Sequence, residues 1–252
     1  MPGMKNSPRY KVVSVSLAGP YHKQKGQKCQ DFCAFRQQGK KIVAIVADGA
    51  GSAKYGHLGA KYVCEALCRL LISGNTSAIK QSVIEAIEAA RDMLTCHRLN
   101  KMKSELGLID FASTVVGVFY DGKKGLFFHI GDGAAIALFR KDIRRTVISE
   151  PENGIFSSET FFFTMEDWKD SLRFTPFEGA QSLFLMTDGV TGFALKRGAR
   201  AIESGFIEPI DAFLKNEKSS KRAAKALKNT LETPKACRLS GDDKTLIRIG
   251  LK

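Results

Sequence analysis

Aspartates recur in this sequence beside apolar runs and beside glycine. They are Asp48 in KIVAIVADGAGS, Asp132 in FFHIGDGAAI, Asp188 in SLFLMTDGV, and Asp242 with Asp243 in LSGDDKT. Val, Ile, Phe and Leu favour a pleated, buried strand, and glycine permits the tight turn that ends it. We therefore expect each aspartate at a strand end, where carboxylates from distant parts of the chain can converge.

Converging carboxylates repel one another unless they are protonated or share a cation. Several carboxylate oxygens together form the ligand set that hard divalent cations prefer. The pattern therefore favours a metal site for Mg²⁺ or Mn²⁺.

The apolar periodicity predicts the elements that must position these residues. In the first part of the chain, strands are expected at 11–18, 31–36 and 41–47, and helices at about 57–72 and 77–103. In the middle, four strand candidates follow one another with short turns, which suits antiparallel pairing. They are FASTVVGVFY, LFFHIGDG, AAIALFRK and DIRRTVISE.

A long irregular segment, about 150–180, is expected to form a flap with strands at 160–165 and near 171–175. The strand SLFLMT, one or two helices between about 206 and 232, and a last strand KTLIRIG complete the chain. Two antiparallel sheets packed face to face, with helices outside, accommodate this order. We expect residues 1–252 to form one domain of mixed α/β class.

The bulk composition is that of a soluble globular protein, with 44% hydrophobic and 26% charged residues. No apolar run is long enough to span a bilayer, and the N-terminal residues lack a secretion signal, so a cytoplasmic protein is expected. Cys64 and Cys68 share one face of a predicted helix, and we expect all six cysteines to be reduced. The net charge of +13 is spread along the chain without a nucleic-acid-binding pattern.

Six short motifs, in order, resemble those of the metal-dependent serine/threonine protein phosphatases of type 2C (the PPM family). The resemblance runs from about Gly19 to Ile249. The matching motifs are CQD with Gln30 and Asp31, ADGAG with Asp48 and Gly49, ASTVV with Ser113 and Thr114, GDGA with Asp132, TDGV with Asp188, and GDDKT with Asp242. Each motif alone is weak, because an isolated Asp-Gly is only a turn.

The resemblance implies an αββα sandwich with a two-metal centre at one edge. Asp48 would bridge both cations, and Asp188 and Asp242 would complete one metal site. The backbone carbonyl of Gly49 would contribute to the other site. In the Asp242–Asp243 pair, the motif favours the first residue as the metal ligand.

Two further aspartates have implied roles. Asp31 would orient a metal-bound water, and Asp132 matches the acidic ligand of a weaker third cation. The expected cofactors are therefore two or three Mn²⁺ or Mg²⁺ ions. Paired cations would lower the pKa of a shared water and supply the hydroxide that attacks a phosphate ester.

The chain departs from the family at the group that grips phosphate. The family's Gly-x-x-Arg is Gly19-Pro-Tyr-His22 here, so His22, helped by Lys23 or Lys25, is the candidate phosphate-binding residue. These residues lack the bidentate fork of arginine. Gln30 stands where many members have a metal-linked Glu, and Ala50 follows Asp48-Gly49 where some members have a histidine.

Each candidate also has a structural interpretation. Asp48 and Asp188 could start helices, because aspartate is a good N-cap. Asp132 could serve a hairpin turn, Asp31 could simply begin a strand, and His22 could be a solvated surface residue. The ordered set of motifs favours the metal interpretation for Asp48 and Asp188.

The predicted function is hydrolysis of phosphoserine and phosphothreonine esters by a bacterial-type protein phosphatase. Its expected partners are a phosphorylated protein substrate and an opposing Ser/Thr kinase, and a monomer is expected. The alternative is a pseudophosphatase that keeps the fold as a binding or regulatory module. Nucleic-acid binding driven by the net charge is a disfavoured third candidate.

Overall fold

The computed structural model describes residues 10–74, 76–97, 107–139, 146–152, 160–196 and 198–251. Its strands are β1 (Lys11–Leu17), β2 (Phe32–Gln38), β3 (Lys41–Ala47), β4 (Val115–Tyr120), β5 (Lys124–Ile130), β6 (Ala134–Leu138), β7 (Thr146–Ser149), β8 (Arg173–Glu178), β9 (Ser182–Met186) and β10 (Lys244–Gly250). Its α-helices are α1 (Pro20–Gln24), α2 (Gly56–Leu71), α3 (Ile79–His97), α4 (Asp188–Ala194), α5 (Ser204–Asn216), α6 (Ser220–Leu231) and α7 (Pro234–Leu239).

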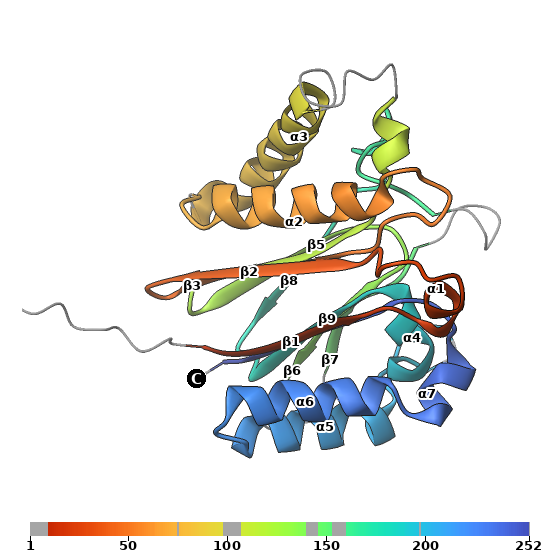
Figure 1. The fold of residues 1–252 in the computed structure, drawn as a ribbon. Coiled ribbons are helices and arrows are strands. Elements are labelled where there is room, and N and C mark those ends of the chain that lie inside the picture. The colour runs from red at the N-terminus through yellow and green to blue at the C-terminus, as the bar shows by residue number, and fades with distance from the viewer. Residues whose placement is uncertain are drawn as a thin grey trace, which may run out of the picture.

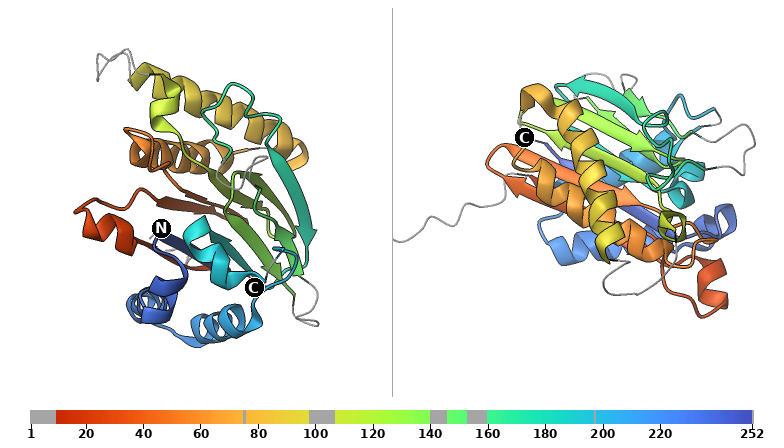
Figure 2. Two further views of the ribbon diagram at one scale, coloured as in Figure 1. Left: turned by 90° about the vertical axis from the view of Figure 1, so that its right-hand side faces the viewer. Right: turned by 90° about the horizontal axis from the view of Figure 1, so that it is seen from above.

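The strands form two five-stranded antiparallel sheets that lie face to face. One sheet has the order β2-β3-β4-β5-β8 and the other the order β1-β10-β9-β6-β7. Helices α2 and α3 cover the outer face of the first sheet, and α5 and α6 cover that of the second (Figures 1 and 2). The predicted αββα sandwich is therefore confirmed.

The central strand β3 shows why its sequence is an uninterrupted apolar run. Val43 and Ile45 pack toward α2 and α3, whereas Ile42 and Ala44 face the other sheet. A strand that is covered on both faces needs apolar residues at every position, not only at alternate ones. The layered core thus follows from the sequence of the strand.

The second sheet is covered by an amphipathic helix pair. Ile207 of α5 and Leu227 of α6 pack with Phe184 of β9 in one buried cluster. Arg248 of β10 is buried beneath α5, and its guanidinium donates hydrogen bonds of 2.9 and 2.7 Å to Asp211 Oδ1. This pair satisfies a charge that would otherwise be buried without a partner.

The antiparallel register brings four chain segments to one edge of the sandwich. Phe32 at the start of β2 pairs with Ala47 at the end of β3, and Leu246 near the start of β10 pairs with Met186 at the end of β9. Helices α1, α4 and α7 gather at the same end of the molecule (Figure 1). The aspartates that flank these strands must therefore approach one another.

Most predicted elements are present with small shifts at their ends. The predicted strand at 160–165 is wrong, because these residues form an isolated bridge and turns. Their apolar side chains fill the core instead, as Phe163 does, while its backbone N–H donates to the Ser113 carbonyl at 3.2 Å. The short helices α1 and α7 were not predicted.

Parts of three expected elements lie outside the described residues. They are the end of the second helix at 98–103, the segment 140–145 between β6 and β7, and the centre of the expected flap at 153–159. Within the described ranges, no helix combines the length and apolar composition needed to cross a bilayer.

Candidate metal and phosphate site

The predicted aspartates converge at the edge where the two sheets meet. Asp48 follows β3 of one sheet, and Asp188 follows β9 of the other. Burial raises the pKa of Asp48 well above its usual range, and the nearby charges of Asp31, Asp188 and Asp242 raise it further. Four carboxylates from distant parts of the chain therefore share one electrostatic environment.

Asp31 is held by a hydroxyl from the opposite sheet. Its side chain is buried, and Thr187 Oγ1 donates a hydrogen bond of 2.7 Å to Asp31 Oδ2. The same hydroxyl oxygen accepts the backbone N–H of Thr245 at 3.0 Å. Burial raises the pKa of Asp31 to about 7, although the hydrogen bond from Thr187 opposes this shift.

Asp188 and Asp132 lie close enough for the charge of Asp132 to affect the Asp188 carboxyl. Burial raises the pKa of Asp188 to about 7, and the charges of Asp132 and Asp242 add to the shift. Burial also raises the pKa of Asp132, whose Oδ2 accepts a hydrogen bond of 2.8 Å from Thr160 Oγ1. Thr160 belongs to the predicted flap at about 150–180, so a flap residue contacts Asp132 directly.

Three buried carboxylate oxygens in this cluster receive no hydrogen bond from a backbone, hydroxyl or amide group, and Asp31 and Asp188 have only the Asp48 carboxyl beside them in addition to the contacts above. The three oxygens are Asp31 Oδ1, Asp132 Oδ1 and Asp188 Oδ1. An ionised carboxylate can only accept, and a buried acceptor without a partner is costly. A divalent cation would satisfy these oxygens and remove the mutual repulsion, so the donor set fits Mg²⁺ or Mn²⁺.

Asp243 anchors the chain segment that leads to Asp31. Its buried carboxylate accepts the backbone N–H of Gly19 through Oδ1 at 2.7 Å and that of Gln30 through Oδ2 at 2.5 Å. Both oxygens are thus occupied by backbone donors. This geometry supports Asp242 rather than Asp243 as the metal ligand.

Two glycines permit this close approach of backbones. A Cβ atom at Gly19 would lie 2.1 Å from the Asp242 carbonyl oxygen, and one at Gly189 would lie 1.8 Å from the Asp243 carbonyl oxygen. No side chain fits at such distances. The glycine after Asp188 is therefore needed for close packing at the start of α4.

His22 lies on α1 and points toward the anchoring carboxylate. Its Nδ1 is 2.8 Å from Asp243 Oδ1, but the contact is not aligned as a hydrogen bond. His22, Asp242 and Asp243 each present one ligand atom within 4.8 Å of the others, the one such group of three among the described residues. Because backbone N–H groups already occupy Asp243, we interpret this group as an anchor for α1 and not as a cation site.

The other two predicted phosphate-binding residues lie on the outer side of α1. Lys23 Nζ pairs with Glu232 Oε1 at 2.9 Å, and Lys25 is exposed at the end of the helix. The structure thus brings His22 closest to the aspartates. A role in phosphate binding remains a prediction for all three.

The Asp48-Gly49 turn is fixed by backbone and hydroxyl contacts. The Asp48 N–H donates to Thr114 Oγ1 at 3.0 Å, and the Gly49 N–H donates to the Gln30 carbonyl at 3.3 Å. The Gln30 side-chain oxygen accepts the His57 N–H at 3.2 Å at the start of α2. Gln30 therefore binds a helix end, where its Oε1 satisfies an otherwise free N–H group.

Sequence reasoning missed two residues that contact the predicted ligands. Thr187 precedes Asp188 in the TDGV motif, so its position beside a predicted ligand was a usable signal. Thr160 lies in an irregular segment far from any motif, and nothing in the sequence pointed to it.

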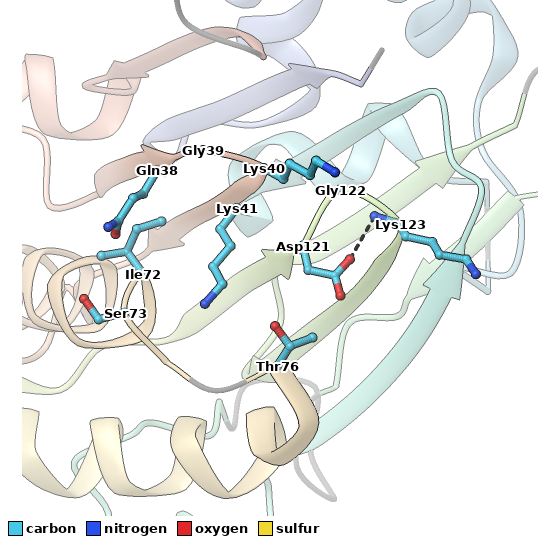
Figure 3. Close-up of a pocket in the computed structure, with 10 residues that line it drawn as sticks. All are labelled: Gln38, Gly39, Lys40, Lys41, Ile72, Ser73, Thr76, Asp121, Gly122 and Lys123. Atoms are coloured by element: carbon cyan, nitrogen blue, oxygen red, sulfur yellow. Dashed lines mark hydrogen bonds between the residues drawn. The ribbon is translucent and has the colours of Figure 1, made fainter. Parts of the chain in front are cut away.

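A separate cavity of about 700 Å³ opens at the opposite end of the sandwich, where the β2–β3 hairpin turns (Figure 3). It is lined by Lys40, Lys41 and Lys123 among others, and Lys41 Nζ donates to the Gly74 carbonyl at 2.8 Å. The seven residues of β3 separate it from Asp48 by about 20 Å. This cavity contains none of the converging aspartates.

Comparison with known proteins agrees with the sandwich fold and with the order of the motifs. Residues 18–232 match the family described as "Protein phosphatase 2C". The match covers most of the chain, so this chain belongs to the protein phosphatase 2C family and is an enzyme of that class. The resemblance found in the motifs is therefore confirmed.

One relative is serine/threonine-protein phosphatase 3 of Escherichia coli (strain K12), which is 25% identical over 94% of this chain and 96% of its own length. Among solved structures, the serine/threonine phosphatase Stp1 from Staphylococcus aureus aligns with a TM-score of 0.66 at 15% identity, over 100% of this chain and 99% of that one. RsbX in complex with magnesium aligns with a TM-score of 0.58 at 14% identity, over the full length of both chains. These structural alignments agree with the fold.

Proposed function

We propose that this chain hydrolyses phosphoserine and phosphothreonine esters of proteins through water activated at a two-cation centre. The observation that carries the proposal is the set of donor-free oxygens on Asp31, Asp132 and Asp188 beside Asp48. Such a cluster is unfavourable without a cation. The name of the E. coli relative supports serine and threonine as the residues acted on.

The aspartates of the site would bind the cations. Asp48, Asp188 and Asp242 would hold the cations with the carbonyl of Gly49, and Asp132 would serve a third, weaker ion. Bound cations would supply a nucleophile by lowering the pKa of water, and would offset charge on the phosphate. The complex of RsbX with magnesium supports Mg²⁺ as one candidate ion, beside Mn²⁺.

The remaining residues would orient the reactants. Asp31, fixed by Thr187, would accept a hydrogen bond from the attacking water. His22 would contact the phosphate from the side of α1, with Lys23 and Lys25 contributing positive charge. The substrate would be a phosphorylated protein, and an opposing Ser/Thr kinase would supply it.

The decisive experiment measures turnover of a phosphothreonine peptide and of p-nitrophenyl phosphate with Mn²⁺ or Mg²⁺ present. We expect EDTA to abolish both activities, excess Mn²⁺ to restore them, and Asp48→Asn to remove both while the protein stays folded. Activity that survives chelation would refute the two-cation proposal. Mn²⁺ binding by calorimetry without any turnover would instead favour the pseudophosphatase.

A further inference from the structure

A basic and partly apolar surface borders the proposed catalytic site. We define it as the α1–α7 face, formed by Tyr21, Leu239, Lys23, Lys25, Lys235 and Arg238. Helices α1 and α7 lie at the same end of the molecule as α4, the helix that begins with Asp188 (Figure 1).

The α1–α7 face is joined to the site by backbone contacts. The Tyr21 N–H donates to the Gly241 carbonyl at 3.0 Å, and a Cβ atom at Gly241 would lie 2.4 Å from the Tyr21 ring. Gly241 directly precedes Asp242, a proposed ligand. The aromatic ring therefore rests on the chain segment that carries the proposed metal site.

Two large apolar side chains of this face are exposed to solvent. Tyr21 is 63% exposed and Leu239 is 56% exposed. The exposure leaves apolar surface available to a partner at the edge of the site. Tyrosine is enriched in protein interfaces, since its ring adds apolar area and its hydroxyl stays hydrogen-bonded.

The charges on this face have one sign. Residues 19–30 and 233–241 contain no Asp or Glu, and Lys25, Lys235 and Arg238 are exposed. The adjoining acids are Glu232, which pairs with Lys23 at 2.9 Å, and Asp31, Asp242 and Asp243, which are buried or half-buried at the proposed site. The exposed charges of the face itself are therefore positive, which favours acidic residues on the partner.

We propose that the α1–α7 face docks the protein substrate, and that it selects phosphorylated segments with acidic residues and an apolar residue near the phosphoester. This inference rests on the proposed phosphatase function and specifies its substrate class. Tyr21 and Leu239 contact the apolar residue, and Lys235 and Arg238 attract the acidic ones. Lys235, Arg238 and Leu239 contribute to substrate binding and leave the chemical step unchanged.

The test compares the wild type with the double variant Lys235→Glu/Arg238→Glu on three substrates. These are a phosphothreonine peptide with acidic and leucine flanks, the same peptide with basic flanks, and p-nitrophenyl phosphate. We expect the KM of the acidic peptide to rise about 3- to 10-fold, because each exposed ion pair is worth little. The kcat and the hydrolysis of p-nitrophenyl phosphate should not change.

The matched control is Lys40→Glu/Lys123→Glu, which makes the same charge change at the distant cavity of Figure 3. This control should leave all KM values unaltered. Leu239→Ser should raise the KM of the leucine-containing peptide and should not affect a peptide that has serine in place of leucine. Equal effects of the two double variants would overturn the proposal, because they would reflect only net charge.

Two arms separate this proposal from its alternatives. If the wild type hydrolyses none of the substrates, the proposed function fails. The docking face is then tested by fluorescence anisotropy with a labelled acidic phosphopeptide, whose binding should be lost in Lys235→Glu/Arg238→Glu, the α7 double variant. A single-stranded oligonucleotide serves as the second probe. If the α7 double variant loses oligonucleotide binding but keeps the peptide KM, the face binds nucleic acid and the proposal is wrong.

Discussion

Thr187 Oγ1 donates a hydrogen bond of 2.7 Å to Asp31 Oδ2, and the two residues belong to strand ends of different sheets. This contact ties the residue proposed to orient water to the segment that carries Asp188. Because Thr187 also accepts from the Thr245 N–H at 3.0 Å, its hydroxyl has no freedom to turn away.

We expect Thr187→Val to lower kcat with Mn²⁺ by about 10- to 100-fold. The estimate follows from the loss of a hydrogen bond to a buried carboxylate, about 1.5–3 kcal/mol, at about 1.4 kcal/mol per tenfold in rate. Thr187→Ser keeps the hydroxyl and is the matched control, so it should retain most of the activity. Equal activity of the Val and Ser variants on p-nitrophenyl phosphate would contradict a role for the hydroxyl.

Metal-free protein should lose stability as the pH rises toward neutrality. The Asp188 carboxyl has a pKa of about 7 when folded, against 3.8 ordinarily. At acid pH the carboxyl is neutral in the folded state, and the stability that this neutral form contributes is lost as the pH rises through about 7. Metal-free Asp188→Asn should therefore melt a few degrees above the wild type at pH 8, on the scale of about 2–4 °C per kcal/mol.

The same pair of proteins gives an internal control in the melting experiment. Near pH 4 the two melting temperatures should approach each other, because the wild-type carboxyl is then neutral as well. Saturating Mn²⁺ should reverse the order at pH 8 by stabilising the wild type more than the variant. A variant that is less stable at every pH without metal would show that the buried charge of Asp188 does not destabilise the fold.

The proposed division of ligands predicts distinct effects on metal binding. Asp48→Asn should weaken binding of both proposed principal ions, because its carboxylate would bridge them. Asp132→Asn should remove only the weakest binding event and leave the others intact. Calorimetric titration with Mn²⁺ measures this stoichiometry directly, and a full loss of binding in Asp132→Asn would assign that residue to the principal centre.

Asp243 should matter for substrate binding through the segment that it anchors. Asp243→Asn replaces one acceptor oxygen with an NH₂ donor, so either Gly19 or Gln30 loses its partner. We expect the KM for p-nitrophenyl phosphate to rise several-fold, because α1 carries His22. The control is Asp211→Asn, which weakens the buried contacts with Arg248 and should lower the melting temperature without changing KM.

A KM effect of the same size in both of these variants would mean that loss of stability, and not anchoring, explains the result. His22→Arg provides an independent check of the phosphate role. The arginine introduces a bidentate donor at this position, and we expect it to lower the KM for p-nitrophenyl phosphate. An unchanged KM would contradict contact between residue 22 and the phosphate.

The sandwich was predictable because its strands are strongly patterned. The run from Ile42 to Ala47 is apolar at each position, and that pattern is typical of a strand covered on both faces. The positions of Asp48 and Asp188 followed from the strand ends and the glycines after them. Both sheets and their helices agree with these expectations.

The details that depend on packing were not predictable. Residues 160–165 are rich in phenylalanine, which favours strands locally, yet Phe163 is used to fill the core. Helices α1 and α7 are too short for a periodic signal and are stabilised by tertiary contacts such as that of Tyr21 with Gly241. The contact of Thr160 with Asp132 joins residues 28 positions apart without any motif.

The proposed ligands come from both sheets, Asp48 from the β2–β3 edge and Asp188 with Asp242 from the β9–β10 edge. Neither sheet holds all of the proposed ligands, so cations bound there would connect the two sheets. A sliding of one layer over the other by a single residue would break the centre apart. We therefore expect the phosphatase activity to depend on how accurately the two sheets are aligned.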